Sequence, residues 1–325
     1  MTPAESEELA AHCRIVTRRL REGRVVAFLG AGANLCGRPT DADWRDGQYL
    51  PSGGELAAYL AESYAYPSRE VPDLLRVSQY IQAVTGGTVL YEELHDLFSR
   101  HYEPNDLHHL LAAVPDAVRR WRDEGYDTPY QLIVTTNYDD ALESAFVVAG
   151  EEFDLVTYVA KGVHRGKFMH RRADGTSQLI EEPNRYRELS LDTRTVILKI
   201  HGAVDRSDPS QDSYVITEDN YRVPRAEGRL QPPAGDAHGG DEREPLPLPR
   251  LQPQRLEPAR DPATDLGRAA VRGPVHVVGD PVGAVGLEER LWRRRNVEIL
   301  DVDLAAYVAE LDRLFVAAGE RASPP

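Results

Sequence analysis

The stretch Val25-Val26-Ala27-Phe28-Leu29-Gly30-Ala31-Gly32-Ala33-Asn34 decides the expected fold. An apolar run that starts with β-branched residues ends abruptly in two closely spaced glycines. This pattern is typical of a buried parallel strand entering a phosphate-facing loop, where glycine permits a positive φ and the close approach of a pyrophosphate. A glycine turn without a ligand is an equally good interpretation at this point, because Leu35 stands where the dinucleotide fingerprint has its third glycine.

Two further polar motifs come directly after apolar runs. Thr135-Thr136-Asn137-Tyr138-Asp139 ends the run over residues 130–135, and His201-Gly202 follows the run over residues 195–200. Open α/β sheets bind ligands beyond the carboxyl ends of their strands, so both motifs are candidate site residues. His201 is a candidate general base, beside a glycine that clears space.

The first of these motifs also has a simpler interpretation. Thr136 or Asn137 could cap a helix expected over residues 137–148, with Asp139 and Asp140 favoured by the helix dipole. Capping alone does not explain why similar strings recur at other strand ends.

The remaining pattern indicates a mixed α/β protein with a Rossmann-like parallel sheet. Several helices are expected before the second strand, and their number favours an inserted helical layer over a single crossover helix. They cover residues 5–22 and 89–102 and begin at the Ser52 capping box, at Pro72 and at Asn105. Further strands are expected at residues 153–159, 166–170, 192–200, 214–216, 275–278 and 297–300, and helices at 287–294 and 302–315. The loop over residues 35–51 either folds over a ligand or is a surface excursion pinned by Trp44.

Composition excludes several classes of function. The chain has 325 residues and a net charge of −15, which argues against a nucleic-acid-binding surface. It has no apolar run of about 18 residues and no signal-peptide pattern, so we expect a cytoplasmic protein without a membrane segment. Cys13 and Cys36 are its only cysteines, and the adjacent His108 and His109 do not share a helix face, so no metal site is expected.

Residues 223–270 differ sharply from the rest of the chain. They contain no Phe, Trp, Tyr, Ile, Met, Lys or Cys, and Arg, Pro, Gly, Ala, Asp and Glu dominate. Such a stretch buries too little apolar surface to fold, so we expect disorder there. The chain is therefore divided into a first part over residues 1–222, an irregular Arg/Pro-rich segment over 223–272, and closing strands and helices of the same domain over 273–318.

Taken in order, the three strand-end motifs resemble those of the sirtuin-like (silent information regulator-like) family. The matching strings are Gly30-Ala31-Gly32-Ala33-Asn34, Thr135-Thr136-Asn137-Tyr138-Asp139 and Ile200-His201-Gly202. They are most similar to the bacterial branch of NAD-consuming domains found in anti-phage defence proteins. The resemblance covers about residues 23–221 and resumes weakly near residue 275.

This resemblance implies NAD as the substrate and assigns roles to individual residues. The implied NAD-binding residues are Gly30, Ala31, Gly32, Ala33, Asn34, Thr136, Asp139 and Gly202, and the implied catalytic residues are Asn137 and His201. The glycine loop would hold the pyrophosphate, Asn137 and Asp139 would contact the nicotinamide ribose and the nicotinamide, and His201 would be the base.

The chain departs from the family in its cysteines. Protein deacylases of this family carry a zinc module of four cysteines, which two cysteines cannot build. The resemblance therefore implies hydrolysis of NAD+ to nicotinamide and ADP-ribose without a metal. Two alternatives stay open: an NAD-dependent deacylase or ADP-ribosyltransferase, and a non-catalytic module that binds NAD or ADP-ribose and signals to a partner. A homo-oligomer or a defence-system partner protein is expected in addition to NAD.

A second departure concerns the irregular segment. The family has another apolar strand after the histidine motif, and the composition of residues 223–270 does not provide one. We hypothesise that this segment is translated out of frame, through compensating insertions or deletions. Resequencing tests this, because the same unbroken frame in several isolates would rule it out.

Limited proteolysis tests the expected disorder. Trypsin should cut first between Val223 and Arg272, because many arginines lie there in backbone that we expect to be unprotected. The products are identified by mass spectrometry after brief digestion. First cuts elsewhere, with this segment left intact, would show that it is a compact and genuine insertion.

Overall fold

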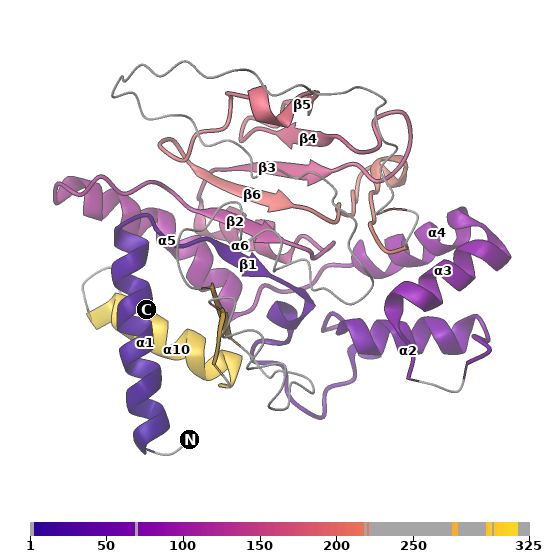
Figure 1. Ribbon diagram of the computed structural model, residues 1–325, viewed down its shortest axis with the longest axis horizontal. Helices are drawn as coiled ribbons and strands as arrows, with labels where there is room; N and C mark the ends of the chain where they lie inside the picture. Colours follow the sequence, from indigo (N-terminus) through magenta and orange to yellow (C-terminus); the bar gives the residue numbers. More distant parts are fainter. Residues whose placement is uncertain are drawn as a thin grey trace.

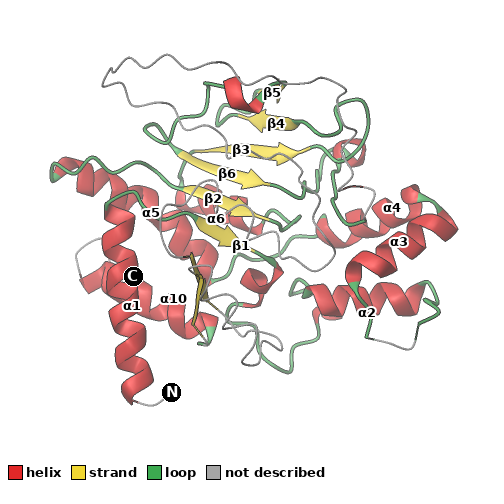
Figure 2. Cartoon of the chain, viewed as in Figure 1, coloured by secondary structure: helices red, strands yellow, loops and turns green. Residues whose placement is uncertain are grey.

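The computed structural model describes residues 3–68, 71–217, 220, 275–278, 297–300 and 302–317. These residues form a mixed α/β fold built on a six-stranded sheet, drawn in Figures 1 and 2. The strands lie in the order β1-β2-β6-β3-β4-β5. Their bounds are β1 (Ala27–Leu29), β2 (Leu132–Thr135), β3 (Phe153–Tyr158), β4 (Phe168–Arg171), β5 (Ser177–Ile180) and β6 (Thr195–Lys199). The expected Rossmann-like parallel sheet is confirmed for β1, β2, β6 and β3, and β4 and β5 extend it as antiparallel strands.

The central strands are buried on both faces, which explains their continuous apolar runs. Along β6, Ile197 belongs to one hydrophobic cluster, and its neighbours Val196 and Leu198 belong to another on the opposite face. The first face is covered by α5 (Asp106–Asp123) and α6 (Ala141–Ala149).

The first and last described helices pack together beside α5. The helix α1 (Pro3–Arg21) contacts α10 (Leu304–Ala317), and α10 also contacts α5. The strands β7 (Val275–Val278) and β8 (Val297–Leu300) form a separate parallel pair and coincide with strands expected from the sequence.

An inserted helical layer is present, as expected. The helices α2 (Gly53–Ser63), α3 (Leu74–Thr85) and α4 (Gly87–Phe98) form a hydrophobic core of their own. Figure 1 shows them together on the side toward which the arrows of β3 and β6 point. The helix that begins at the Asn105 cap is α5, and it covers the sheet rather than joining this layer, because Leu111 and Ala112 pack against the strands.

The strand expected over residues 214–216 is wrong. Tyr214, Val215 and Ile216 are buried, but they pair with no strand of the described sheet. Their side chains instead contribute to the helical layer, since Tyr214 and Ile216 lie in its core. The backbone nitrogen of Val215 donates to the His201 carbonyl oxygen at 2.8 Å, so this buried segment ties His201 to the helical layer.

Several sequence expectations lie outside the described residues. These are the disorder over residues 223–270, the out-of-frame hypothesis and the helix over 287–294. The three-part division of the chain stays a prediction.

The helical layer should be sensitive to cavities. Leu60 is completely buried in its core, so Leu60→Ala should lower the free energy of unfolding by about 2–5 kcal/mol, measured by chemical denaturation. Val148 is 74% exposed in α6 and is the control, for which Val148→Ala should change stability by less than about 0.5 kcal/mol. Equal effects of the two substitutions would contradict the assigned core.

Candidate functional site

The three strand-end motifs lie level with one another at one edge of the sheet. Leu29 of β1 pairs with Thr135 of β2, and Thr135 pairs with Lys199 of β6, all in parallel register. Ala31, Asn137 and His201 each stand two residues beyond these partners. Because neighbouring strands are about 4.8 Å apart, the register brings the three motifs together at the carboxyl edge. This is the edge at which open α/β sheets bind ligands.

The glycine loop leaves space that the described residues do not fill. Neither Gly30 nor Gly32 has a positive φ, so the expected left-handed conformation is wrong for both. Within the described part of the chain, a Cβ added to Gly32 would meet nothing within 4 Å, and one added to Gly30 would make only an ordinary contact with Thr136. The missing side chains are therefore not explained by backbone strain or packing, and the loop fits a ligand that approaches the main chain closely.

The rest of the glycine loop is held by a hydrogen bond to the start of α5. Residues Ala31–Leu35 form a short 3-10 helix in which Ala31 and Gly32 are exposed and Ala33 is buried. The Asn105 side-chain amide at the start of α5 donates to the Ala33 carbonyl oxygen at 2.8 Å. The sequence analysis identified Asn105 only as a helix cap and missed this second contact.

Asn34, Asp139 and Asn137 form one hydrogen-bonded chain. Asn34 Nδ2 donates to Asp139 Oδ2 at 2.8 Å, and Asn137 Nδ2 donates to Asn34 Oδ1 at 3.3 Å. The other carboxylate oxygen of Asp139 accepts the backbone N–H of Ala141 at 3.1 Å. Asp139 is 4% exposed, whereas Asn34 and Asn137 are half-buried. A buried carboxylate therefore orients two amides that reach solvent.

The simple capping interpretation places the helix start wrongly. α6 begins at Ala141 with Asp140 as its N-cap residue, so neither Thr136 nor Asn137 caps it. Thr136 instead joins β2 to the glycine loop, since its backbone nitrogen donates to the Leu29 carbonyl oxygen at 3.0 Å. The Asn137 backbone nitrogen donates to Thr135 Oγ1 at 3.0 Å. The side-chain amide of Asn137 is not used in this bond and lies two residues beyond the end of β2.

His201 is half-buried at the end of β6. Burial lowers its pKa to about 4, because the surrounding protein disfavours the imidazolium. The imidazole is therefore neutral near pH 7, which is the protonation state of a histidine that acts as a base.

His108 on α5 lies behind the site and is 2% exposed. Burial lowers its pKa to about 4, although the Asp139 carboxylate acts in the opposite direction. Its Nδ1 accepts the Asn105 backbone N–H at 3.3 Å, which accounts for its place in the capping box.

The space left by the missing side chain of Gly202 is occupied by the backbone of Ser213. Gly202 has a φ of +88°, and an added Cβ would lie 2.1 Å from the Ser213 carbonyl oxygen. Ser213 is in turn fixed between two loops, because its hydroxyl donates to the Tyr158 carbonyl oxygen at 2.7 Å and accepts the Ala160 N–H at 2.8 Å. Gly202 therefore shapes the loop that carries His201.

Sequence reasoning missed two buried charges beneath the site. Lys199 is 1% exposed, and its ammonium donates to Glu143 Oε1 at 2.7 Å and to the Asp139 carbonyl oxygen. The available signal was a lysine inside the otherwise apolar strand β6, together with a glutamate in the first turn of α6, the helix that follows β2.

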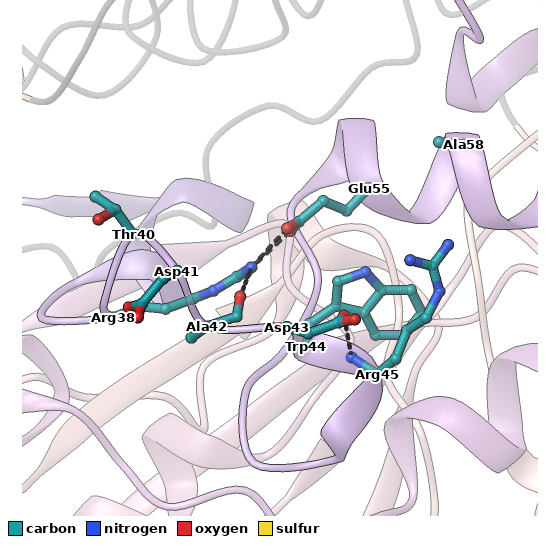
Figure 3. A pocket seen from close by; sticks show the side chains of 9 residues that line it. All are labelled: Arg38, Thr40, Asp41, Ala42, Asp43, Trp44, Arg45, Glu55 and Ala58. Carbon is teal, nitrogen blue, oxygen red and sulfur yellow. Dashed lines mark hydrogen bonds and ion pairs between the residues drawn. The ribbon is translucent and has the colours of Figure 1, made fainter.

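A pocket of about 340 Å³ lies next to the loop over residues 35–51 (Figure 3). Arg38 is held there by Glu55 at 2.5 and 2.9 Å, and Trp44 is buried in the core of the helical layer. The burial of Trp44 agrees with a pinned surface excursion. None of the predicted site residues lines this pocket.

The two cysteines belong to the hydrophobic core. Cys13 and Cys36 are both buried in the cluster between α1, α5 and α10. Burial raises the pKa of the Cys13 thiol to about 12 and raises that of Cys36 as well, so both are neutral core residues. In the described part of the chain no three His, Cys, Asp or Glu side chains converge on a metal-sized site, and no helix there could span a bilayer.

The fold is that of an α/β protein with a Rossmann-like sheet, and the candidate site lies at the carboxyl edge of that sheet. A family model described as SIR2-like domain matches residues 131–234, which include the second and third motifs. Members of that family are NAD-dependent enzymes, so the match supports the sirtuin-like resemblance and an NAD-related activity. No curated protein matches the chain.

Replacing Gly202 tests the loop geometry. Gly202→Ala should lower the free energy of unfolding by about 2–4 kcal/mol, because it adds a steric clash with Ser213 to the strain of a positive φ. Gly175 is the matched control, since its φ is +85° and an added Cβ would meet nothing within 4 Å. Gly175→Ala should cost about 1 kcal/mol, and equal losses in denaturation experiments would contradict the close approach of Ser213.

Proposed function

We propose that the protein hydrolyses NAD+ to nicotinamide and ADP-ribose. The observation that carries this proposal is the hydrogen-bonded chain Asp139–Asn34–Asn137, which lies level with His201 and beside the glycine loop. The match to a SIR2-like domain supports NAD as the substrate.

The reaction breaks the bond between nicotinamide and ribose, and water adds to the ribose carbon. Positive charge develops on the ribose as neutral nicotinamide leaves. A site that favours this cleavage needs groups that orient the ribose, hold the nicotinamide and accept a proton from water.

The residues at the strand ends can supply these functions. We assign the pyrophosphate to the main chain from Gly30 through Ala33, where the glycines leave room. Asn34 fixes the amide of Asn137, and the Asn137 Oδ1 faces no donor among the described residues, so it can accept a bond from water or from a ribose hydroxyl. Asp139 has carboxylate lone pairs beyond the two protein bonds it accepts, and its predicted contact with nicotinamide stays part of the proposal.

His201 supplies the base. A pKa of about 4 keeps the imidazole neutral near pH 7, and the neutral form is the one that can accept a proton from the attacking water. Gly202 shapes the loop that presents it, and Thr136 holds the end of β2 next to the glycine loop.

Hydrolysis is favoured over deacylation because the thiols of Cys13 and Cys36 are buried and neutral. They are unsuited to a zinc module. Incubation with NAD and an acetylated peptide separates the activities, since O-acetyl-ADP-ribose would identify a deacylase. Retention of NAD without turnover would identify a non-catalytic binding module.

The motif resemblance extends the proposal to a cytoplasmic role in bacterial anti-phage defence, with a homo-oligomer or a partner protein. Expression in a bacterial host challenged with phage tests this part. Protection by the unaltered chain that is lost in His201→Ala supports it, and equal plaque counts with and without the protein contradict it.

Substitution of the two predicted catalytic residues tests the assignment. His201→Ala should lower the rate of NAD cleavage by roughly 10²-fold or more with the fold retained, because the proton acceptor is lost. Asn137→Ala should lower the rate similarly through the loss of positioning. Nicotinamide release is measured by chromatography, and the fold is checked by circular dichroism. Full activity of His201→Ala would remove this histidine from the mechanism.

The pH dependence of cleavage tests the lowered pKa of His201. Its pKa is lowered to about 4, so the proton-accepting neutral form persists from pH 8 down to about pH 5. The rate should therefore stay level over this range and fall only as the pH drops through about 4, with folding checked at each pH. An inflection near pH 6.5, the ordinary histidine value, would show that the protein does not lower the pKa of His201.

A further inference from the structure

Lys199 joins the end of β6 to the start of α6. Its ammonium is buried between the sheet and the helix, where it contacts one oxygen of Glu143 and the backbone carbonyl of Asp139. Glu143 lies in the first turn of α6 and is 6% exposed. Among the described residues, Lys199 is the cation that forms an ion pair with Glu143.

A gain in folding stability does not account for this buried ion pair. A buried ion pair contributes little net free energy, because taking both charges out of water costs about as much as their attraction returns. The lysine also places a positive charge near the positive end of the α6 dipole. Apolar side chains of similar size would join the strand to the helix as well as this pair does.

The contact with Asp139 connects the pair to the candidate site. Asp139 precedes the N-cap residue Asp140, so its carbonyl lies outside the hydrogen-bond ladder of α6. The carboxylate of the same residue accepts a hydrogen bond from the side-chain amide of Asn34. The side-chain oxygen of Asn34 in turn accepts a hydrogen bond from the side-chain amide of Asn137. Lys199 therefore fixes the backbone of the residue that orients both asparagines.

We propose that Lys199, paired with Glu143, is a positioning residue that holds Asp139, Asn34 and Asn137 in the arrangement required for NAD cleavage. The inference rests on the proposed function. Lys199 itself contacts no substrate, because its side chain is 1% exposed.

A double variant tests this role without leaving a lone buried charge. Lys199→Met combined with Glu143→Leu removes both charges and keeps the side-chain volumes similar, so the fold should persist. Its kcat for NAD cleavage should fall about 10²-fold, because small displacements of positioned groups can cost that much. Its KM should stay close to that of the unaltered protein.

Arg194 provides the matched control. It pairs with Asp154 at 3.3 Å just before the other end of β6, away from the carboxyl edge. Arg194→Met should leave kcat unchanged, which separates positioning of the site from a general loss of buried or half-buried ion pairs.

Hydrogen exchange gives a readout that does not depend on activity. The peptide covering residues 136–141 should exchange faster in the double variant than in the unaltered protein, with exchange elsewhere in the sheet unchanged. The two claims fail in different ways. The proposed function fails if the unaltered protein does not cleave NAD, and in that case unchanged exchange of this peptide in the double variant would overturn the positioning role.

If the unaltered protein does cleave NAD, the positioning role is overturned when the double variant has the same kcat as the unaltered protein, whatever its exchange.

Discussion

The parallel pairing of β1, β2 and β6 is the constraint on which the candidate site depends. Leu29, Thr135 and Lys199 are paired across the three strands, so the chain leaves all three at the same level of the sheet. Residues that are far apart in sequence thereby meet at one edge. A slip of two residues in either pairing would move one motif along the sheet by about 7 Å and separate it from the others.

Polar side chains beyond that edge are held by bonds to one another. The carboxylate of Asp139 is buried and orients Asn34, and Asn34 orients Asn137. The buried segment after Gly202 ties His201 to the helical layer through the Val215 backbone. Hydrogen bonds within the protein therefore fix the groups proposed to contact NAD, and such preorganisation reduces the entropy lost on binding.

The sequence predicted the parallel sheet because apolar, β-branched runs of four to six residues are buried on both faces. It also predicted the helical layer and the helix starts at Ser52, in that layer, and at Asn105, which caps α5 beside the sheet, because a helix start is a local pattern. The strand expected at residues 214–216 was wrong, since apolar residues in an extended segment can pack against helices without pairing. Local sequence cannot distinguish these two environments.

The candidate site shows the same limit. The motifs identified Asn137 and His201, because polar residues after apolar strands are visible in a sequence. The contact between Asn34 and Asp139 spans 105 residues, and the contact between Lys199 and Glu143 spans 56, so both depend on sheet order and register. Gly30 and Gly202 look alike in the sequence, yet Gly202 relieves contact with Ser213, whereas Gly30 faces open space or ordinary contacts.

A crystal structure of the protein with ADP-ribose tests the central claim most directly. The account predicts that the pyrophosphate lies against the main chain of Gly30 to Gly32 and that the ribose lies within hydrogen-bond distance of Asn137, on the same side as His201. ADP-ribose bound instead in the pocket between Arg38 and Trp44, with the strand ends empty, would contradict it.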